Sequence, residues 1–548
     1  MNYYSLIFFT VIGLGLVSAL DLGLGYQCTP NIPTKQTNVN ERHTVVIIGA
    51  GVAGTNAAMV LEKNNVTDWI ILEYQSRVGG RTRTVKVGND PVETCAMWVQ
   101  GGAEHNPILK LAKEINLKGG NSKWDYFAYP NIGGGNIPQA TVNDVVNKRW
   151  YDAYLCVGNK IVPAIECGQI PDMSLSDSYA LCGWKARTPF EFAVEESFTN
   201  SEWGETMART STLNSGTWSA YSFYGEDQAP KGQNPGTPNF VTDPRGIQAI
   251  IHWNVNKTLV CSDNNGPCLG NCSKRCGIAD PRIRLNSEVK VLNTQTNVIT
   301  LASGQKIQAD YIISTIPLGV LQHSFSTGTG LIQPTWSRER ILNLNRYHMI
   351  NYKKIVIKFT YQFWPNDYHF VLPTTDTLFA INMWTNYNMP EYLPGSNMIL
   401  GILNSYASDM AETMSPEDYL TLVLKQLNAV FPGAAVRGNV VDYFVTNNIN
   451  TPWLRGAFSN RGPDLTPEIF RNLWQPEDGC HVFWSGEAPC DYLNGYVVGG
   501  YWMGAASANS VLKAMGKYSG LPYAENDCFR VPSYNEPVFD NPTCPVVY

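Results

Sequence analysis

The chain has 548 residues, which is more than one hydrophobic core normally supports, so we expect two domains of ordinary size. Its composition is 44% hydrophobic and 16% charged, which is typical of a globular protein. The formal net charge of -6 excludes the basic surface that nucleic acid or anionic lipid requires, and it is compatible with small cationic ligands.

The N-terminus has the pattern of a secretory signal. An apolar run from Leu6 to Val17 is followed by Val17-Ser18-Ala19, a small-residue cleavage pattern. The run is too short to span a membrane comfortably, and no later stretch is long and apolar enough to do so. We therefore expect residues 1–19 to be removed and the mature protein to be soluble and secreted, without stable membrane insertion.

The 13 cysteines indicate an oxidising compartment, and their odd number leaves at least one thiol unpaired or paired between chains. Four crowd into one loop: Cys261, Cys268, Cys272 and Cys276. Their spacing matches no common zinc pattern, so we expect disulfides there and no metal site. Three N-glycosylation sequons predict surface positions: Asn65, Asn256 and Asn271.

A dinucleotide-binding pattern follows the polar lead. Residues 44–48 form a β-branched strand, and three glycines then supply G-x-G-x-x-G at the turn into a helix: Gly49, Gly51 and Gly54. A second strand, residues 69–72, ends on Glu73. Glycines let backbone N–H groups approach a pyrophosphate, the helix N-terminus favours its charge, and Glu73 can accept ribose hydroxyls.

The next residues favour FAD over NAD. The stretch RVGGRTRT, residues 77–84, adds two glycines and flanking arginines just beyond the ribose acid. It resembles the second pyrophosphate clamp of flavoproteins in the amine oxidase superfamily, which nicotinamide dehydrogenases lack. By this resemblance, Arg81 supplies cationic donors for the phosphates or the polar edge of the flavin.

The resemblance spans roughly residues 45–515 and is strongest to the secreted polyamine oxidases of plants. AMWVQGG at 96–102 is similar to the segment beneath the flavin, and PRIRLNSEVKVL is similar to the strand whose backbone, at Val289, holds the adenine. LRGAFSN and the stretch from Trp484 to Leu512 look like the C-terminal flavin motifs, which places Glu487 and Val497 near the cofactor.

The resemblance also implies the fold class, which is α/β. A Rossmann-like FAD-binding domain, built from residues 42–105, 242–330 and 450–520, is interleaved with an α+β substrate-binding domain, built from residues 106–241 and 331–449. Residues 521–548 form a C-terminal tail outside both.

One strand carries the predicted reactive lysine. INYKKIVIKF, residues 350–359, alternates so that Tyr352, Lys354 and Lys358 share one face. In the family, a lysine in a Y-x-K pattern holds a water beside flavin N5. The resemblance therefore implies that Lys354 takes part in proton movement and oxygen reduction, with Tyr352 beside it. Lys358 is expected at the rim or surface, and Lys353 points to the opposite face.

The resemblance also implies the substrate site. Phe458 and Tyr496 are expected to wall the substrate in front of the flavin, with Trp98 as a weaker third wall. TPFEFAVEE, residues 188–196, is similar to the segment of plant enzymes that supplies an acid for a distal ammonium, here Glu191. The flanking Glu195 and Glu196 are expected to be solvated.

Three positions depart from the family pattern. Gln100 stands where plant enzymes carry glutamate and animal enzymes often histidine, although Glu104 and His105 lie nearby. Asn448 falls about where relatives carry a tryptophan under the flavin, so either the cavity is more open or the correspondence slips by a few residues. Ala457 stands where monoamine oxidases have the cysteine that bonds the flavin, which implies noncovalent FAD.

These residues together predict a secreted FAD-dependent polyamine oxidase that uses dioxygen and yields hydrogen peroxide. An L-amino-acid oxidase, or another monoamine oxidase, is the first alternative, although no arginine is marked for a substrate carboxylate. A catalytically inactive flavin-binding extracellular protein is the second. A peroxide assay across polyamines, monoamines and L-amino acids separates the three.

Overall fold

The computed structural model describes residues 31–101, 106–124, 126–216, 239–260, 276–373, 379–477, 479–491, 493–518 and 528. It also gives the backbone of a short strand pair, β1 (Leu20–Asp21) and β2 (Gln27–Cys28). The predicted signal at residues 1–19, three cysteines of the cysteine-rich loop, and Glu104 with His105 lie outside the described residues.

The first of two main sheets has eight strands in the order β11-β4-β3-β14-β13-β12-β15, with β23 also paired to β14. Their bounds are β3 (Glu41–Ile48), β4 (Trp69–Leu72), β11 (Ile283–Arg284), β12 (Val289–Asn293), β13 (Val298–Leu301), β14 (Lys306–Ser314), β15 (Ile332–Gln333) and β23 (Val482–Trp484). The central strands β4, β3, β14 and β23 run parallel. Both faces of β3 are buried, which is why its sequence is continuously apolar from Val45 to Ile48.

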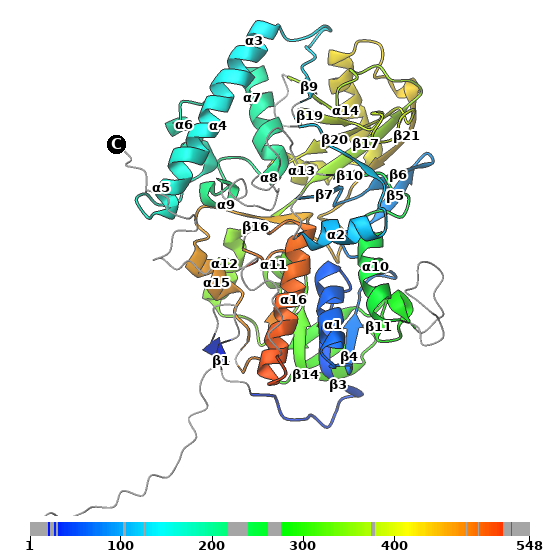
Figure 1. The fold of residues 1–548 in the computed structure, drawn as a ribbon, viewed down its shortest axis with the longest axis vertical. Helices are drawn as coiled ribbons and strands as arrows, with labels where there is room; N and C mark the ends of the chain where they lie inside the picture. The colour runs from blue at the N-terminus through cyan, green and yellow to red at the C-terminus, as the bar shows by residue number, and fades with distance from the viewer. Residues whose placement is uncertain are drawn as a thin grey trace, which may run out of the picture.

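Helices cover both faces of this sheet, and Figure 1 shows α1 and α16 lying side by side over it. On one face lie α1 (Val52–Lys63), α10 (Gln248–Thr258) and α16 (Val497–Ala514). On the other lie α11 (Leu318–Thr327), α12 (Arg338–Arg346) and α15 (Pro467–Leu473). Gly504 lets α16 approach α1 closely, because a Cβ there would lie 2.1 Å from the carbonyl oxygen of Ala53.

The second main sheet has six strands in the order β21-β17-β20-β19-β18-β9. Their bounds are β9 (Phe127–Ala128), β17 (Lys353–Phe359), β18 (His369–Val371), β19 (Met383–Asn386), β20 (Met398–Leu403) and β21 (Val440–Val445). One face, with Ile355 and Ile357, packs on α14 (Pro416–Val430), near α13 (Ser405–Ala411). The other face, with Val356, packs on the hairpin of β5 (Thr84–Val87) and β6 (Asp90–Glu93).

A helical region, seen at the upper left of Figure 1, stands beside the second sheet. It begins with α3 (Gln139–Asp144), η1 (Val145–Trp150), α4 (Tyr151–Cys156), η2 (Val157–Ile161) and α5 (Val162–Glu166), which follow one another without a break. It continues with α6 (Leu175–Leu181), α7 (Pro189–Glu195), η3 (Glu196–Asn200), α8 (Ser201–Trp203) and α9 (Thr212–Gly216). The disulfide Cys156–Cys182 ties α4 to the end of α6.

Smaller elements connect these parts. A three-stranded sheet is formed by β7 (Trp98–Val99), β8 (Gly119–Asn121) and β10 (Asn239–Val241), with α2 (Pro107–Glu114) beside it. The strands β16 (Tyr347–Ile350) and β22 (Phe458–Arg461) pair antiparallel. The described residues also include two short 3-10 helices, η7 (Gly277–Ala279) and η8 (Arg437–Asn439).

The strands of the two main sheets come from the interleaved segments predicted for the two domains. The first sheet uses strands from residues 41–72, 283–333 and 482–484, and the second uses strands from residues 127–128 and 353–445. The predicted α/β class is therefore confirmed. One detail differs from the predicted boundaries, because β15 pairs in the first sheet although it lies beyond residue 330.

The predicted glycosylation positions and the cysteine-rich loop can also be compared with the structure. Asn65 is exposed, but Asn256 lies in α10, is 8% exposed, and accepts a hydrogen bond from the backbone N–H of Ile278 at 2.9 Å. The predicted surface position is therefore wrong for Asn256. Asn271 lies outside the described residues. Cys276, from the cysteine-rich loop, is disulfide-bonded.

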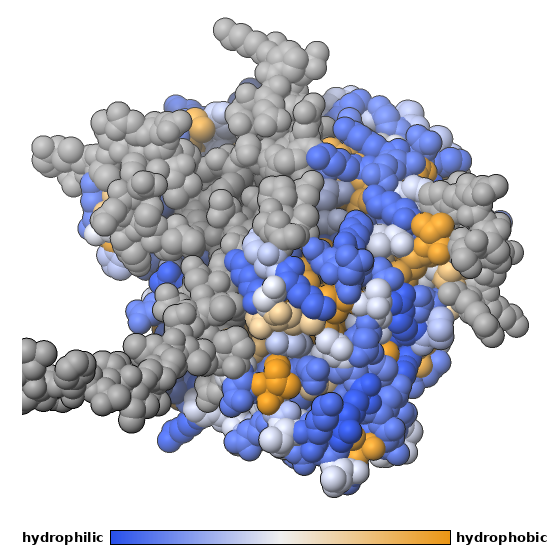
Figure 2. Space-filling model, turned by 60° about the horizontal axis from the view of Figure 1, so that its bottom comes forward, coloured by the Kyte–Doolittle hydropathy of each residue, from blue (hydrophilic) through white to orange (hydrophobic). Residues whose placement is uncertain are grey.

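Figure 2 shows one face of the molecule, where the coloured surface is mainly hydrophilic with scattered hydrophobic spots. None of the described helices combines the length and the apolar character that crossing a membrane requires. In the same part of the chain, no three histidine, cysteine or acidic side chains gather closely enough to hold a metal ion.

Candidate active site

A cavity of about 630 Å³ is lined by residues from both main sheets. The last residues of β3 and β4, Ile48 and Leu72, line it, as does Thr315 just after β14. Crevices at the carboxyl ends of parallel strands are where α/β folds bind ligands. At the second sheet the cavity reaches Lys354 of β17, so a ligand along its length would contact both sheets.

The glycines of the fingerprint shape one end of the cavity. Gly49 has a φ of 102°, and a Cβ there would lie 2.3 Å from Thr315 Oγ1. Gly51 lines the cavity, and the nearest atom to a Cβ built on it is Gly80 Cα at 3.9 Å. Gly54 packs inside, because its Cβ would lie 2.0 Å from Gly49 O. The turn therefore exposes backbone at the start of α1, which is the cradle that a pyrophosphate needs.

Glu73 follows β4 and lines the cavity while being 5% exposed. One carboxylate oxygen accepts a hydrogen bond from Ala50 N–H at 2.7 Å, and the other accepts one from Gln75 N–H at 2.8 Å. Burial raises the pKa of Glu73, and these N–H groups oppose the rise. Each oxygen keeps a second lone pair, so the carboxylate can also accept ribose hydroxyls.

An ion pair lies in the middle of the cavity wall. Arg81 Nη1 donates to Glu487 Oε1 at 2.7 Å and to the carbonyl oxygen of Ala457 at 3.1 Å. The second oxygen of Glu487 accepts from Ser459 Oγ at 2.5 Å and from the backbone N–H of Gly495 at 2.6 Å. Arg81 keeps further N–H donors for an anionic group in the cavity.

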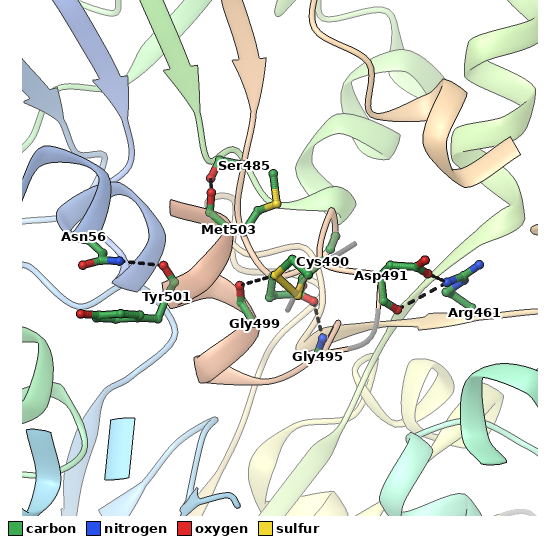
Figure 3. The surroundings of a disulfide bond; sticks show 12 residues. Asn56, Arg461, Ser485, Cys490, Asp491, Gly495, Gly499, Tyr501 and Met503 are labelled. Carbon is green, nitrogen blue, oxygen red and sulfur yellow. Dashed lines mark hydrogen bonds and ion pairs between the residues drawn. A yellow bond between two sulfur atoms is a disulfide. The ribbon is translucent and has the colours of Figure 1, made fainter. Parts of the chain in front are cut away.

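A disulfide holds the segment that carries Glu487 and Tyr496. Figure 3 shows Cys490, which is bonded to Cys528, close to Gly499 of α16. Cys528 Sγ lies 3.5 Å from the carbonyl oxygen of Gly499, and Asp491 forms an ion pair with Arg461. The start of α16, with Val497 at the cavity, is therefore fixed by covalent and charged contacts.

The predicted cofactor residues fit FAD. Seven of the eight line one cavity: Gly49, Gly51, Glu73, Arg81, Val289, Glu487 and Val497. The eighth, Gly54, gives the close packing that brings α1 to the turn. A phosphate cradle, a ribose acid and a cationic donor follow one another along this wall, as the two ends of FAD require.

Lys354 stands on the face of β17 that meets the β5–β6 hairpin. It is 2% exposed, and its Nζ donates a hydrogen bond to the carbonyl oxygen of Cys95. Burial lowers the pKa of Lys354 from its ordinary value of 10.5 to about 8, although the electrostatic interactions with nearby Cys95 and Glu93 act to raise it. A lysine with this pKa can hold or release a proton near neutral pH.

Aromatic side chains surround the end of the cavity at Lys354. Tyr352 donates from its hydroxyl to Ser201 O at 2.8 Å, and its ring meets Phe458 edge-on at 5.3 Å. Apart from Tyr74, which follows Glu73 in the chain, the aromatic residues that line the cavity are Trp98, Trp203, Tyr352, Trp453, Phe458 and Tyr496. Of these, Trp203 and Trp453 were missed from the sequence. The slot they form suits a ligand with a narrow apolar chain.

The cavity also holds a carboxylate that sequence reasoning missed. Glu202, on the short helix α8, lines the cavity and accepts a hydrogen bond from the hydroxyl of Tyr496 at 2.6 Å. Burial raises the pKa of Glu202, and the Tyr496 hydroxyl opposes the rise. Gly204, two residues on, packs so closely that a Cβ would lie 2.9 Å from the Phe458 ring. Glu202 is thereby held beside both predicted aromatic walls.

Glu191 does not belong to this group, which corrects the predicted substrate acid. It caps α7: Thr188 Oγ1 accepts from the Glu191 N–H, and the Glu191 carboxylate accepts from Arg187 and Thr188 N–H groups. It also pairs with Arg149. Burial acts to raise the pKa of Glu191, but Arg149 and these N–H groups together lower it below its ordinary value. Its charge is used locally, and it is not among the residues that line the cavity.

A pattern in the sequence pointed to that structural role. Thr188-Pro189-Phe190-Glu191 is an S/T-x-x-E capping box with proline at the first helical position. The two neighbouring acids also differ from expectation. Glu195 accepts a bond from Trp184 Nε1 at 3.2 Å, and Glu196 accepts one from Asn200 at 2.8 Å. Burial raises the pKa of both, so neither is the solvated loop residue that was predicted.

The three departures from the family pattern have distinct surroundings. Gln100 lines the cavity, so a neutral amide stands there. Asn448 does not line it. Asn448 is buried behind the cavity and donates to the carbonyl oxygen of Tyr352 at 3.0 Å, while Trp453 lines the wall. Ala457 lines the cavity and offers no thiol.

Cys95 is the unpaired cysteine among the cysteines in the described part of the chain. It lines the cavity, and its Sγ lies 3.7 Å from the carbonyl oxygen of Ala457. Burial raises the pKa of its thiol, against nearby Lys354 and Arg81. The odd cysteine count predicted an unpaired thiol, but it could not show that the thiol faces the cofactor cavity.

The two other lysines of β17 differ from Lys354. Lys358 is partly exposed and pairs with Asp90 at 2.8 Å. Lys353 lies on the opposite face, as expected, but it is 3% exposed and pairs with Glu412 at 3.4 Å. Lys354 is therefore the lysine of this strand that lines the cavity.

Comparison with known proteins agrees with this geometry. The sequence profile of the family described as flavin containing amine oxidoreductase matches residues 52–227 and 272–512. The chain is 27% identical over 498 residues to polyamine oxidase 1 of Zea mays, covering 86% of this chain and 92% of that protein. It is 26% identical to polyamine oxidase 6 of Oryza sativa subsp. japonica, covering 87% and 93%.

Solved structures show the same fold. Putrescine oxidase bound to putrescine superposes with a TM-score of 0.61 at 14% identity, covering 85% of this chain and 98% of that one. Cyclohexylamine oxidase from Brevibacterium oxydans superposes with a TM-score of 0.61 at 17% identity, covering 86% and 99%. With the profile matching most of its length, the chain belongs to the flavin-containing amine oxidoreductase family and is an FAD-dependent amine oxidase.

Proposed function

We propose that the chain is a secreted polyamine oxidase that acts on spermidine, spermine or their acetylated forms. The observation that carries this proposal is Glu202, a carboxylate in the aromatic end of the cavity. Within the described ranges, no lysine or arginine forms an ion pair with it. A buried carboxylate without a cationic partner is costly, and an ammonium group of the substrate would supply that partner.

The other residues have complementary roles. Phe458 and Tyr496 form a narrow slot that orients the carbon next to the reacting amine nitrogen. The Tyr496 hydroxyl fixes Glu202 in place, so that the distance from the slot to the carboxylate selects the spacing between two nitrogens. Lys354 holds or moves a proton at its Nζ beside the slot.

The proposed overall reaction converts an amine, dioxygen and water into an aldehyde, a shorter amine and hydrogen peroxide. FAD, when bound, accepts the two electrons removed from the C–N unit and passes them to dioxygen. The side chains of this protein bind the ammonium, exclude bulk water and favour the uncharged nitrogen at the reacting end.

Two further observations support a polyamine substrate and export of the protein. Polyamine oxidase 1 of Zea mays and polyamine oxidase 6 of Oryza sativa resemble the chain over nearly their whole lengths. For export, the support is the predicted signal together with disulfides such as Cys156–Cys182 and Cys490–Cys528.

The cavity gives little support to the alternatives. An L-amino-acid oxidase needs a cation for the substrate carboxylate, whereas the residue that hydrogen-bonds Tyr496 in the aromatic slot is the acid Glu202. Glu202 would repel such a carboxylate. An inactive flavin protein does not account for Lys354, Phe458 and Tyr496 meeting in one cavity.

A peroxide assay on purified holoenzyme tests the proposal. Substrates would be spermidine, spermine, their acetylated forms, phenethylamine and L-amino acids. We expect Glu202→Gln to raise KM for polyamines by roughly ten- to hundredfold, because one buried charge contact is lost, and to affect phenethylamine much less.

Glu191→Gln is the matched control. Glu191 is a buried acid of the same helical region outside the cavity, so its KM values should stay at wild-type levels. Equal effects of Glu202→Gln on all amines, or peroxide from L-amino acids alone, would contradict the polyamine assignment.

A further inference from the structure

The lysine face of β17 lies against the β5–β6 hairpin, and each lysine on that face has an acidic residue of β6 near it. At the rim, Lys358 Nζ lies 2.8 Å from Asp90 Oδ2 and 2.7 Å from the carbonyl oxygen of Ser396. Deeper along the same face, Lys354 donates to the carbonyl oxygen of Cys95, two residues beyond the end of β6. That end is Glu93, so the hairpin brings a second carboxylate toward the cavity lysine.

The two acids of β6 have different surroundings. Asp90 is a partly exposed member of an ordinary ion pair. Glu93 is 3% exposed, and its Oε1 accepts hydrogen bonds from Thr84 Oγ1 at 2.8 Å and from Ile247 N–H at 3.1 Å. In the described part of the chain, its Oε2 has no hydrogen-bond partner. A buried carboxyl oxygen left unpaired is unusual and calls for an explanation.

Four titratable groups face Glu93 from the elements packed around it. Lys354 and Arg77 are cationic, whereas Cys95 and Tyr387 are neutral at pH 7, since their ordinary pKa values lie above 7 and burial raises each further. Burial raises the pKa of Glu93 to about 7. The hydrogen bonds from Thr84 and Ile247 and the positive charges of Lys354 and Arg77 act to lower this pKa. Glu93 and Lys354 therefore both change charge near neutral pH.

We propose that Glu93 is a positioning residue that acts on the cavity only through Lys354, by setting the fraction of Lys354 that carries a proton. The inference rests on the proposed proton role of Lys354. Because Lys354 is 2% exposed, its exchange with bulk water is restricted, and its protonation depends on the charges buried beside it. An ionised Glu93 favours the ammonium form of Lys354, and an ammonium at Lys354 favours ionised Glu93 to the same extent.

The coupling has a definite sign at each residue. Removing the Glu93 carboxylate lowers the pKa of Lys354 further below its ordinary value. Removing the Lys354 ammonium raises the pKa of Glu93 further above its ordinary value. Asp90 already pairs with Lys358, so removing its charge should leave Lys354 nearly unchanged. Asp90→Asn is therefore a control on the same strand.

The first test needs neither cofactor nor substrate. Infrared spectroscopy of the apoprotein, titrated around neutral pH, reports the band of a protonated buried carboxylic acid. Glu93→Gln should remove one such band, and Lys354→Met should move its midpoint upward by about one pH unit, a tenfold change in proton affinity. Asp90→Asn should leave the midpoint in place. A midpoint that is the same in Lys354→Met and in wild type would overturn the proposal.

The second test follows Lys354 in the holoenzyme. FAD is reduced with light or dithionite, and its reoxidation by dioxygen is measured from pH 6 to pH 10, a range of about two units on either side of the Lys354 pKa of about 8. Glu93→Gln should lower the apparent pKa of the reoxidation rate by about one unit relative to wild type and to Asp90→Asn. A uniform loss of rate without a change of apparent pKa would show a merely structural role and overturn the proposal.

The variants keep the experiment decisive. Glutamine at 93 can still accept from Thr84 and Ile247, so the local hydrogen bonds survive. If that variant fails to fold, Thr84→Val removes one donor and raises the pKa of Glu93, which should shift the profile in the same direction by less. An unchanged profile there would overturn the proposal. Because reoxidation of the flavin needs no amine substrate, this test can still be interpreted if the polyamine assignment proves wrong.

Discussion

Lys354 and Lys358 lie four residues apart on one face of β17, and burial separates their chemistry. Lys354→Met removes the ammonium while keeping a side chain of similar length, so FAD should still bind. Reoxidation by dioxygen should slow by about a hundredfold or more, because a positioned proton donor is lost. Stopped-flow measurement of both half-reactions checks this result.

Lys358→Met is the control for that experiment. Lys358 pairs with Asp90 at the rim, so its loss should change either rate by less than about twofold. Wild-type reoxidation in the Lys354 variant would remove Lys354 from the oxygen step. It would leave the buried lysine without a catalytic explanation.

The burial of Lys354 also has a cost in stability. Its pKa is about 8 in the folded protein and 10.5 when unperturbed, so the unfolded chain binds more protons between these values. Stability of the wild type should therefore rise with pH from about 8 to 10.5. Below pH 8, Lys354→Met should raise the free energy of unfolding by roughly 1–3 kcal/mol, and the gain should shrink as pH rises through that window.

Urea unfolding of wild type and Lys354→Met at several pH values measures this difference. Lys358→Met should show no comparable gain, because Lys358 is paired and partly exposed. A destabilised Lys354 variant at pH 7 would mean that the ammonium makes a net favourable contribution where it lies.

At the scale of elements, two glycines on the α1 side of the fold separate cofactor binding from packing. Gly51 caps α1 with a φ of -76°, and a Cβ there meets only Gly80 Cα at 3.9 Å. Gly51→Val should therefore keep the free energy of unfolding of the apoprotein within about 1 kcal/mol, yet abolish FAD binding because the side chain fills the phosphate cradle.

Gly504→Val is the packing counterpart. A Cβ there would lie 2.1 Å from Ala53 O, so α16 and α1 must separate, at a cost of roughly 3 kcal/mol or more. Flavin fluorescence after gel filtration and urea unfolding distinguish the two variants. Full FAD occupancy in Gly51→Val would mean that the cofactor does not use this turn.

The cofactor site could be predicted from the sequence more fully than the substrate site. The fingerprint at residues 49–54 and the acid Glu73 lie within one βαβ unit, where the spacing of glycines and strands fixes the local geometry. The substrate acid is different. Glu191 and Glu202 belong to the same helical run, and only packing decides which carboxylate faces the cavity. The capping box was the one local signal that separated them.

At the scale of the whole molecule, the interleaving of two domains places residues from distant segments in one cavity. Arg81 and Glu487 form an ion pair across 406 positions, and Lys354 reaches Cys95 across 259. No local pattern predicts such pairs, so the resemblance to a family supplied the arrangement of the fold. The positions of Glu202, Glu93 and Cys95 became evident only in the folded chain.

The state of the cofactor is a property of this whole cavity. Ala457 offers no sulfur, which predicts noncovalent FAD, but the unpaired thiol of Cys95 lines the same cavity. Burial raises the pKa of that thiol, so little thiolate is present at neutral pH, and thiolate is the form that attacks. We therefore expect acid or heat to precipitate a colourless polypeptide and to leave yellow FAD in the supernatant.

Absorbance of the pellet and the supernatant measures this outcome, with Cys95→Ala as the control. In both proteins the flavin should be released completely. Colour that stays with the wild-type pellet and leaves the Cys95→Ala pellet would show a bond to Cys95, in spite of alanine at 457. Colour retained by both pellets would point to an attachment elsewhere in the chain and would contradict noncovalent binding altogether.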